Sequence, residues 1–190
     1  MPPSSCEDAA FAVPSTLKTT EKASRIEEEV MELFDEFRSP LLRYSLSLGL
    51  SIHDAEEVAQ EVFLALFRHL QLGRSRKNLR GWLFRVCHNL ALKQRLANQT
   101  LAQRTAGDSS VVEGHADPGP SPEAEMSEAQ RRYHLQAVVR VLPENDQHCL
   151  RLRAEGLRYR EIATVLGMSL GAVSISLTRS LARLVRADGR

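Results

Sequence analysis

The feature that most constrains this chain is a pair of short helical patterns near its C-terminus, within Leu157 to Leu184. Apolar residues recur at spacings of three and four through both patterns, so each pattern predicts a helix with one buried face. Gly167 falls between them, where a tight interhelical turn needs a left-handed backbone that glycine adopts without steric cost. Ser169 follows at the position where the second helix needs an N-cap. Helix, short glycine turn and helix together predict a helix-turn-helix, whose second helix usually enters the major groove of DNA.

The remainder of the chain shows helical periodicity and no strand pattern. We therefore predict an all-α fold of two small helical domains joined by a flexible linker, with the helix-turn-helix in the second domain. The linker is indicated by a Pro-, Gly-, Ser- and Asp-rich stretch without periodicity. The predicted divisions are a disordered tail at 1–23, a first domain at 24–97, an acidic linker at 98–126 and a second domain at 127–190.

Start and stop signals subdivide both domains into helices. A capping box at Ser24–Glu27 predicts the start of the first helix. Pro40 suits a first-turn position, so a second helix is predicted over 41–48. Ser51 predicts the N-cap of a third helix. In the second domain Pro143 suits the first position of a new helix in the same way.

The net charge of +1 conceals a strong segregation of charge along the chain. Residues 26–61 carry ten acidic and two basic side chains, whereas residues 62–96 carry eight basic side chains and none that is acidic. Residues 97–127 have a net charge of −4 and residues 128–190 a net charge of +5. Two basic segments are therefore masked in the total, and near-neutrality does not argue against a nucleic-acid partner.

The sequence lacks the features expected of membrane proteins, secreted proteins, metalloproteins and enzymes. No apolar run approaches the roughly 18 residues of a membrane span, and no signal peptide is evident, so we expect a cytoplasmic protein without membrane insertion. The cysteines, Cys6, Cys87 and Cys149, are odd in number and widely spaced, which favours reduced thiols. Metal-ligand spacing, phosphate-binding glycine loops and nucleophile motifs are missing from the sequence. We therefore expect no cofactor, no metal and no enzymatic activity.

Four motifs in a fixed order resemble those of bacterial RNA polymerase sigma factors. They are Asp54–Phe63 (DAEEVAQEVF), Gly81–Asn89 (GWLFRVCHN), Leu142–Glu144 (LPE) and the helix-turn-helix. The small two-domain layout resembles the extracytoplasmic-function (ECF) group, and the likeness covers residues 27–97 and 128–187. The resemblance implies a protein that binds core RNA polymerase, recognises the −35 and −10 promoter elements and helps to melt the DNA.

By this resemblance the first domain is the family's region 2. The helix that begins near Asp54 would dock on the clamp helices of the largest polymerase subunit. The implied polymerase-binding residues are Asp54, Glu56, Glu57, Gln60 and Glu61. The same acidic groups also fit a simpler interpretation, in which they only solvate a surface helix.

Region 2 of the family also melts and reads the −10 element, which requires a place for an extruded base and cations for its backbone. The implied −10 DNA-binding residues are Arg80, Trp82, Arg85, Asn89 and Lys93. The Asn89 amide matches a position that holds a flipped base of the non-template strand. Trp82 lies in an apolar stripe, so core packing is the alternative role for its ring.

By the same resemblance the second domain is region 4, which would read the −35 element and also meet the polymerase flap. The implied −35 DNA-binding residues are Arg158, Tyr159, Ser169, Gly171, Ala172, Ser174, Ile175, Thr178 and Arg179. This sequence has serine at 174 and 176, where relatives commonly carry Lys or Arg. We therefore expect weaker and less salt-dependent DNA binding by this domain alone.

Two other functions remain open at this point. A LuxR-type transcriptional regulator would share the helix-turn-helix but would sense a ligand or phosphoryl group with its N-terminal domain. A sigma-like decoy would hold polymerase or an inhibitor without starting transcription. ECF relatives are often held by an anti-sigma factor, but no residue here identifies such a partner.

Overall fold

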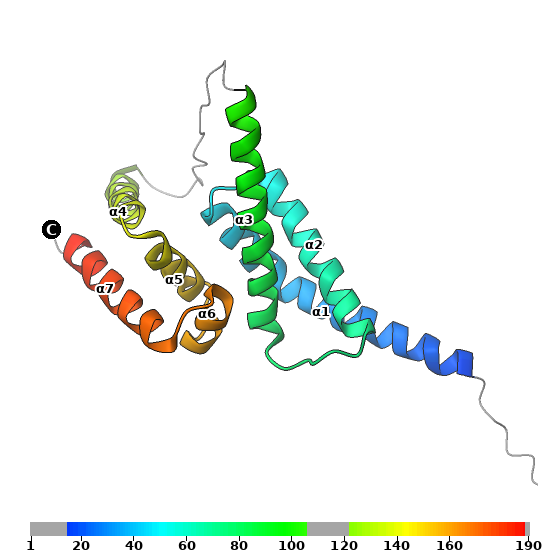
Figure 1. Ribbon diagram of the computed structural model, residues 1–190. Coiled ribbons are helices and arrows are strands. Elements are labelled where there is room, and N and C mark those ends of the chain that lie inside the picture. The colour runs from blue at the N-terminus through cyan, green and yellow to red at the C-terminus, as the bar shows by residue number, and fades with distance from the viewer. Residues whose placement is uncertain (1–14, 106–121, 189–190) are drawn as a thin grey trace, which may run out of the picture.

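The computed structural model describes residues 15–105 and 122–188, which form seven α-helices and no strand. The helices fall into two units (Figure 1). The first contains α1 (Ser15–Ser47), α2 (Ile52–Gln71) and α3 (Leu79–Thr105). The second contains α4 (Pro122–Arg140), α5 (Glu144–Ala154), α6 (Tyr159–Leu166) and α7 (Leu170–Asp188). The all-α prediction is confirmed.

The three helices of the first unit pack against one another around a common apolar core. Side chains at three- and four-residue spacing along α2 turn inward, and most of them are inaccessible to solvent. The Ser51 hydroxyl caps α2 by accepting a hydrogen bond from the Asp54 N–H at 3.1 Å, as predicted. The fully buried residues of this core include Leu41, Tyr44, Leu66, Leu83 and Phe84.

The helix break predicted at Pro40 is wrong, because α1 runs through this residue without interruption. Proline removes one backbone hydrogen bond from a helix and strains the preceding turn. Phe37, Leu41 and Tyr44 lie on the two sides of Pro40 and are all buried, so tertiary packing holds the chain helical. The start of α1 also differs from the prediction, at Ser15 instead of Ser24.

The second unit contains the helix-turn-helix as α6 and α7, with α5 and α4 packed on α7. Gly167 has φ 65° and ψ 26°, the left-handed conformation that the turn was predicted to need. The Ser169 hydroxyl accepts a hydrogen bond from the Ala172 N–H at 3.1 Å and so caps α7. Pro143 differs by one position from the prediction, because it is the N-cap of α5.

The two units are in contact, since α3 packs against α6 and α1 against α5. Their apolar residues form one continuous buried cluster, which includes Leu83 and Phe84 of α3 and Leu157 and Ile162 of the second unit. In the part of the chain that the structure describes, no single helix has the length and apolarity to cross a membrane. Only α6 and α7 taken together pass that test, across a bend of 108°.

The helices next to the predicted linker are longer than expected. α3 continues to Thr105 and α4 begins at Pro122, so both enter the range 98–126. Residues 106–121, and with them most of the predicted acidic linker, lie outside the described residues, as do residues 1–14 of the tail predicted over 1–23, including Cys6. Cys87 and Cys149 are free, buried thiols.

Candidate nucleic-acid interface

The acidic residues predicted to bind polymerase lie on the outer face of α2. Glu56, Glu57, Gln60 and Glu61 are all exposed and lie within five residues of one another along the helix. The Glu56 carboxylate lies 3.7 Å from the Arg38 guanidinium of α1, and both side chains are about half exposed. A surface pair of this kind contributes little stability, so these charges remain available to a partner.

Asp54 differs from the other four predicted residues, because its carboxylate already has three side-chain partners. It accepts hydrogen bonds from Ser51 Oγ at 2.7 Å, from Gln94 Nε2 at 3.0 Å and from Asn98 Nδ2 at 3.0 Å. These donors, led by the Ser51 hydroxyl, hold the pKa of Asp54 below its usual value. Asp54 therefore joins the start of α2 to α3.

Leu64 belongs to the same face of α2 and was not singled out in the sequence. It follows Gln60 by four residues and Glu61 by three, and its side chain is 57% exposed. An exposed leucine beside polar residues adds apolar surface of the kind found at the centre of protein interfaces. Periodicity alone does not distinguish it, because Leu64 stands between two buried positions, Val62 and Leu66.

Three of the predicted −10 residues form a straight row along α3. Arg85, Asn89 and Lys93 follow one another at intervals of four, which places them on one helix face, and all three are exposed. The row presents a cation, an amide and a second cation to solvent. This combination offers charge for backbone phosphates and a donor–acceptor pair for a base edge.

Trp82 lies three residues before Arg85 at the edge of this row. Its ring is half-buried, packs against the apolar core and lies 4.6 Å from the His69 ring, centroid to centroid. The side chain thus combines core packing with a partly accessible surface next to the row. Asn78, which has φ 55°, starts α3 by accepting a hydrogen bond from the Gly81 N–H at 3.2 Å.

Arg80 is the one predicted −10 residue that the second unit holds. Its Nη2 atom donates to the main-chain oxygen of Glu155 at 2.5 Å. The Glu155 carboxylate in turn accepts two hydrogen bonds from Arg43 of α1, at 2.7 and 3.3 Å. Arg80 therefore joins the two units in this arrangement, which the sequence did not predict because its partner is 75 residues away in the chain.

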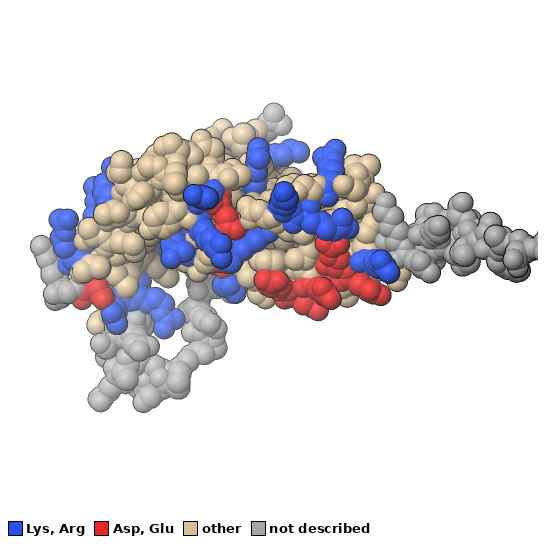
Figure 2. All heavy atoms as spheres, turned by 90° about the horizontal axis from the view of Figure 1, so that it is seen from below, with Lys and Arg blue, Asp and Glu red and all other residues tan. Residues whose placement is uncertain are grey.

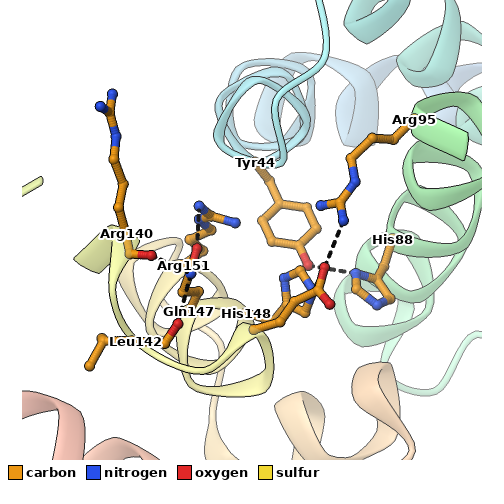
Figure 3. A network of polar contacts seen from close by, with 9 residues as sticks. Tyr44, His88, Arg95, Arg140, Leu142, Gln147, His148 and Arg151 are labelled. Carbon is orange, nitrogen blue, oxygen red and sulfur yellow. Dashed lines mark hydrogen bonds and ion pairs between the residues drawn. The ribbon is translucent and has the colours of Figure 1, made fainter. Parts of the chain in front are cut away.

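A second contact between the units is built from aromatic rings (Figure 3). Tyr44 is fully buried, and its hydroxyl lies 2.8 Å from His88 Nδ1, which accepts this hydrogen bond when the neutral imidazole carries its proton on Nε2. The His88 ring of α3 meets the His148 ring of α5 edge to face, with centroids 5.1 Å apart. Arg95 reaches from α3 to Glu144 of α5 at 2.7 Å.

These imidazoles are held in the neutral form. Burial, followed by the charge of His148, lowers the pKa of His88 to about 4. Burial, followed by the Arg151 guanidinium, also lowers the pKa of His148. Glu144 is the nearby acid that opposes these effects, but it is already paired with Arg95.

The predicted −35 residues gather around a groove at the helix-turn-helix. The groove is lined by Arg158, Tyr159, Arg160 and Glu161 at the start of α6, by Leu170, Gly171 and Ser174 of α7, and by Asn78. Ile175 and Thr178 are exposed further along α7, whereas Ala172 and Ser174 are half-exposed. The exposed side of the α7 start thus carries small and uncharged side chains.

Two residues of α7 turn instead toward α5. Ser176 is buried, and its hydroxyl donates to Asp146 Oδ1 at 2.7 Å. The Ser176 side chain therefore faces the protein interior and not the exposed side of α7. Arg179 donates through Nε and Nη2 to both Asp146 oxygens, at 2.7 to 3.1 Å.

Charge is unevenly distributed over the surface, as the segregation in the sequence predicts. Figure 2 shows basic side chains spread over the face seen from below, and most of the acidic side chains on this face gathered in one patch. The side chains of His53, Asp54 and Glu57 form a separate group on α2, in which the atoms that could bind a metal ion lie within 4.8 Å of one another. The Asp54 carboxylate already accepts hydrogen bonds from Ser51, Gln94 and Asn98. Exposed acidic groups of this kind are common in proteins without a metal ion, so we do not assign a metal site here.

Comparisons with known proteins place this arrangement in context. The sequence matches the family model of sigma-70 region 2 over residues 33–100 and that of sigma-70 region 4 over residues 134–184. It is 33% identical to RNA polymerase sigma-H factor of Pseudomonas aeruginosa over 138 residues, 68% of this chain and 72% of that relative. It is 30% identical to ECF RNA polymerase sigma factor SigE of Mycolicibacterium smegmatis over 155 residues, 80% of this chain and 59% of that relative.

A solved structure shares the fold. The sigma factor RpoE of Bartonella quintana, crystallised with the anti-sigma factor NepR, superposes with a TM-score of 0.63. The match covers 84% of this chain and 96% of that chain at 18% sequence identity. The likeness therefore concerns the arrangement of the helices.

Proposed function

The chain belongs to the sigma-70 family of RNA polymerase sigma factors, in its ECF group, and from this premise we propose how its surfaces divide the work of promoter recognition. The observation that carries the proposal is the presence of both regions, in order, on one chain with two different polar surfaces. Region 2 coincides with the first unit and region 4 with the second. The domain divisions at 24–97 and 127–190 serve as the working boundaries of the two functions.

The outer face of α2 binds core polymerase in this proposal. Glu56, Glu57, Gln60 and Glu61 provide acidic and polar groups for the clamp helices, and Leu64 provides the apolar centre of the contact. Asp54 acts indirectly, because its bonds to Ser51 and α3 position the start of the helix. The alternative, a merely solvated helix, predicts that substitutions on this face leave the affinity for core polymerase unchanged.

The row of Arg85, Asn89 and Lys93 meets the −10 element. The cations contact phosphates of the non-template strand, and the amide of Asn89 holds an extruded base. The partly exposed ring of Trp82 offers a stacking surface at the edge of the row. Arg80 joins this surface only after it is released from the Glu155 main-chain oxygen, so the two units must separate at this point when DNA binds.

The second unit reads the −35 element with the groove at the start of α7. Arg158 and Tyr159 lie at one wall, Gly171 and Ser174 at the other, and Ile175 and Thr178 continue the surface along the helix. Ser169 contributes by capping the helix, so its side chain acts through the position of α7. The chain works in the cytoplasm without a cofactor. An anti-sigma factor is a further partner, as in the solved complex of RpoE with NepR.

Run-off transcription with purified core polymerase tests this function against its alternatives. We expect promoter-specific transcripts only when the chain is added to core. Core binding without transcripts would support the decoy. A LuxR-type regulator would bind DNA without binding core. A Glu57→Lys variant should lose transcription by losing core affinity, whereas Glu36→Lys on the exposed surface of α1 is the matched control and should retain it.

A further inference from the structure

Asp146 is a buried acidic residue that is not among those proposed to contact DNA. It lies in the first turn of α5 and is only 2% exposed, yet it faces the DNA-reading helix α7. A buried carboxylate is costly unless charged or polar donors surround it. Here Ser176 and Arg179 supply those donors through four hydrogen bonds between 2.7 and 3.1 Å.

The geometry of this cluster fixes both the rotation of α7 and the direction of Arg179. Ser176 and Arg179 are three residues apart, so they lie on the same side of the helix. Asp146 of α5 accepts hydrogen bonds from that side of α7, so the side that contains Ser174, Ile175 and Thr178 faces solvent. The side-on fork through Nε and Nη2 holds the planar guanidinium at one edge.

The same cluster changes the charge of the reading surface. The Arg179 side chain is half exposed, at 50%, and without Asp146 it would be a mobile cation close to the DNA backbone. The Asp146 carboxylate neutralises this cation and keeps it in one orientation. The other exposed residues at the start of α7 carry no charge, so the reading helix approaches DNA as a nearly neutral surface.

We propose that Asp146 is a positioning residue for −35 recognition, which holds Arg179 and α7 so that uncharged side chains, and not phosphate attraction, select the DNA. The inference rests on the proposed sigma function of the second unit. It explains why a serine is compatible with position 176, since that hydroxyl is a ligand of Asp146 instead of a DNA contact. It also identifies Arg179 as a cation whose free charge would add affinity for any DNA sequence.

The test uses the full chain bound to core polymerase and a DNA fragment that this holoenzyme selects from a random library. The competitor is the same fragment with its upstream half shuffled. In Asp146→Asn the shape is kept and the charge is removed, so Arg179 is released. We expect several-fold weaker discrimination against the competitor, and a slope of log K against log salt that is steeper by about 0.9, as for one additional phosphate contact.

Two further variants test the same role of Asp146 if Asp146→Asn folds poorly. Arg179→Lys keeps the cation but loses the fork, so it should change slope and discrimination in the same direction as Asp146→Asn. The double variant Asp146→Asn with Arg179→Gln should return the salt slope to the wild-type value, which a purely structural role of Asp146 would not produce. Unchanged slope and discrimination in folded Asp146→Asn or in Arg179→Lys would overturn the inference. Failure of the wild-type holoenzyme to select any fragment would instead overturn the proposed function and, with it, this inference.

Discussion

Acid should weaken this fold through the two histidines that lie between the helical units. His88 is 7% exposed and His148 is 5% exposed, and their rings are in edge-to-face contact. The groups around them are the Tyr44 hydroxyl, the Arg151 guanidinium and the Glu144 carboxylate, which is paired with Arg95. A proton on either ring therefore meets a buried surface with little uncommitted negative charge.

The size of the effect follows from the pKa of His88. It is about 4 in the folded chain, against 6.5 for an exposed histidine, so the unfolded chain binds the extra proton between these values. Stability is fully present above pH 6.5 and declines as the pH falls toward the folded value. At about pH 5 the loss from His88 alone is roughly 2 kcal/mol, since each pH unit corresponds to about 1.4 kcal/mol. His148 adds a loss of the same sign, because its pKa is also lowered.

Urea denaturation at a series of pH values, followed by circular dichroism, measures this loss. The matched variant is His88→Asn, whose amide oxygen occupies the place of Nδ1 and can accept a hydrogen bond from the Tyr44 hydroxyl without becoming charged. Its absolute stability will be lower because the side chain is smaller. Its free energy of unfolding should nevertheless depend less on pH, by about 2 kcal/mol between about pH 7.5 and about pH 5.

The carboxylates of Asp54 and Glu144 contribute little to the change in the free energy of unfolding over this pH range. Asp54 and Glu144 have lowered pKa values, so the stability that they contribute is lost only as the pH falls below their ordinary values near 4. If His88→Asn shows the same pH dependence as the wild-type chain, the neutral, buried histidine contact is not what makes the fold sensitive to acid.

Three further perturbations follow from the structure. Glu155→Arg should reduce the free energy of unfolding by about 1 kcal/mol, with recovery in the double variant that also carries Arg43→Glu; no recovery would mean that the two side chains are not coupled. Gly167→Ala should cost about 1–2 kcal/mol in the same measurement, since φ 65° is strained for alanine while its Cβ would meet no neighbour, and an unchanged midpoint would refute the strained turn. Leu64→Glu should weaken binding to core polymerase about tenfold or more, whereas the equally exposed Met31→Glu should not, and equal effects of the two would remove α2 from the interface.

Local signals predicted the parts of the fold that depend on neighbouring residues. The turn at Gly167 and the caps at Ser51 and Ser169 agree with the structure, because each depends on backbone geometry within a few residues. The break at Pro40 was wrong for the complementary reason. Buried partners from other helices hold α1 together there, and local propensity does not contain that information.

The candidate site divides in the same way. Helical spacing was enough to place Arg85, Asn89 and Lys93 in one row, since a helix face is a property of sequence spacing. The burial of Ser176 against Asp146, 30 residues away, was not predictable from spacing, because two helices must pack before either residue has a partner. The contact of Arg80 with the second unit has the same origin.

Sequencing the transcripts that core polymerase makes from genomic fragments, with and without this chain, tests the sigma function most directly. We expect new start sites that appear only with the chain and share two sequence blocks at a constant spacing, one for each helical unit. Transcripts with the same start sites in both reactions, although the chain binds core, would contradict the assignment.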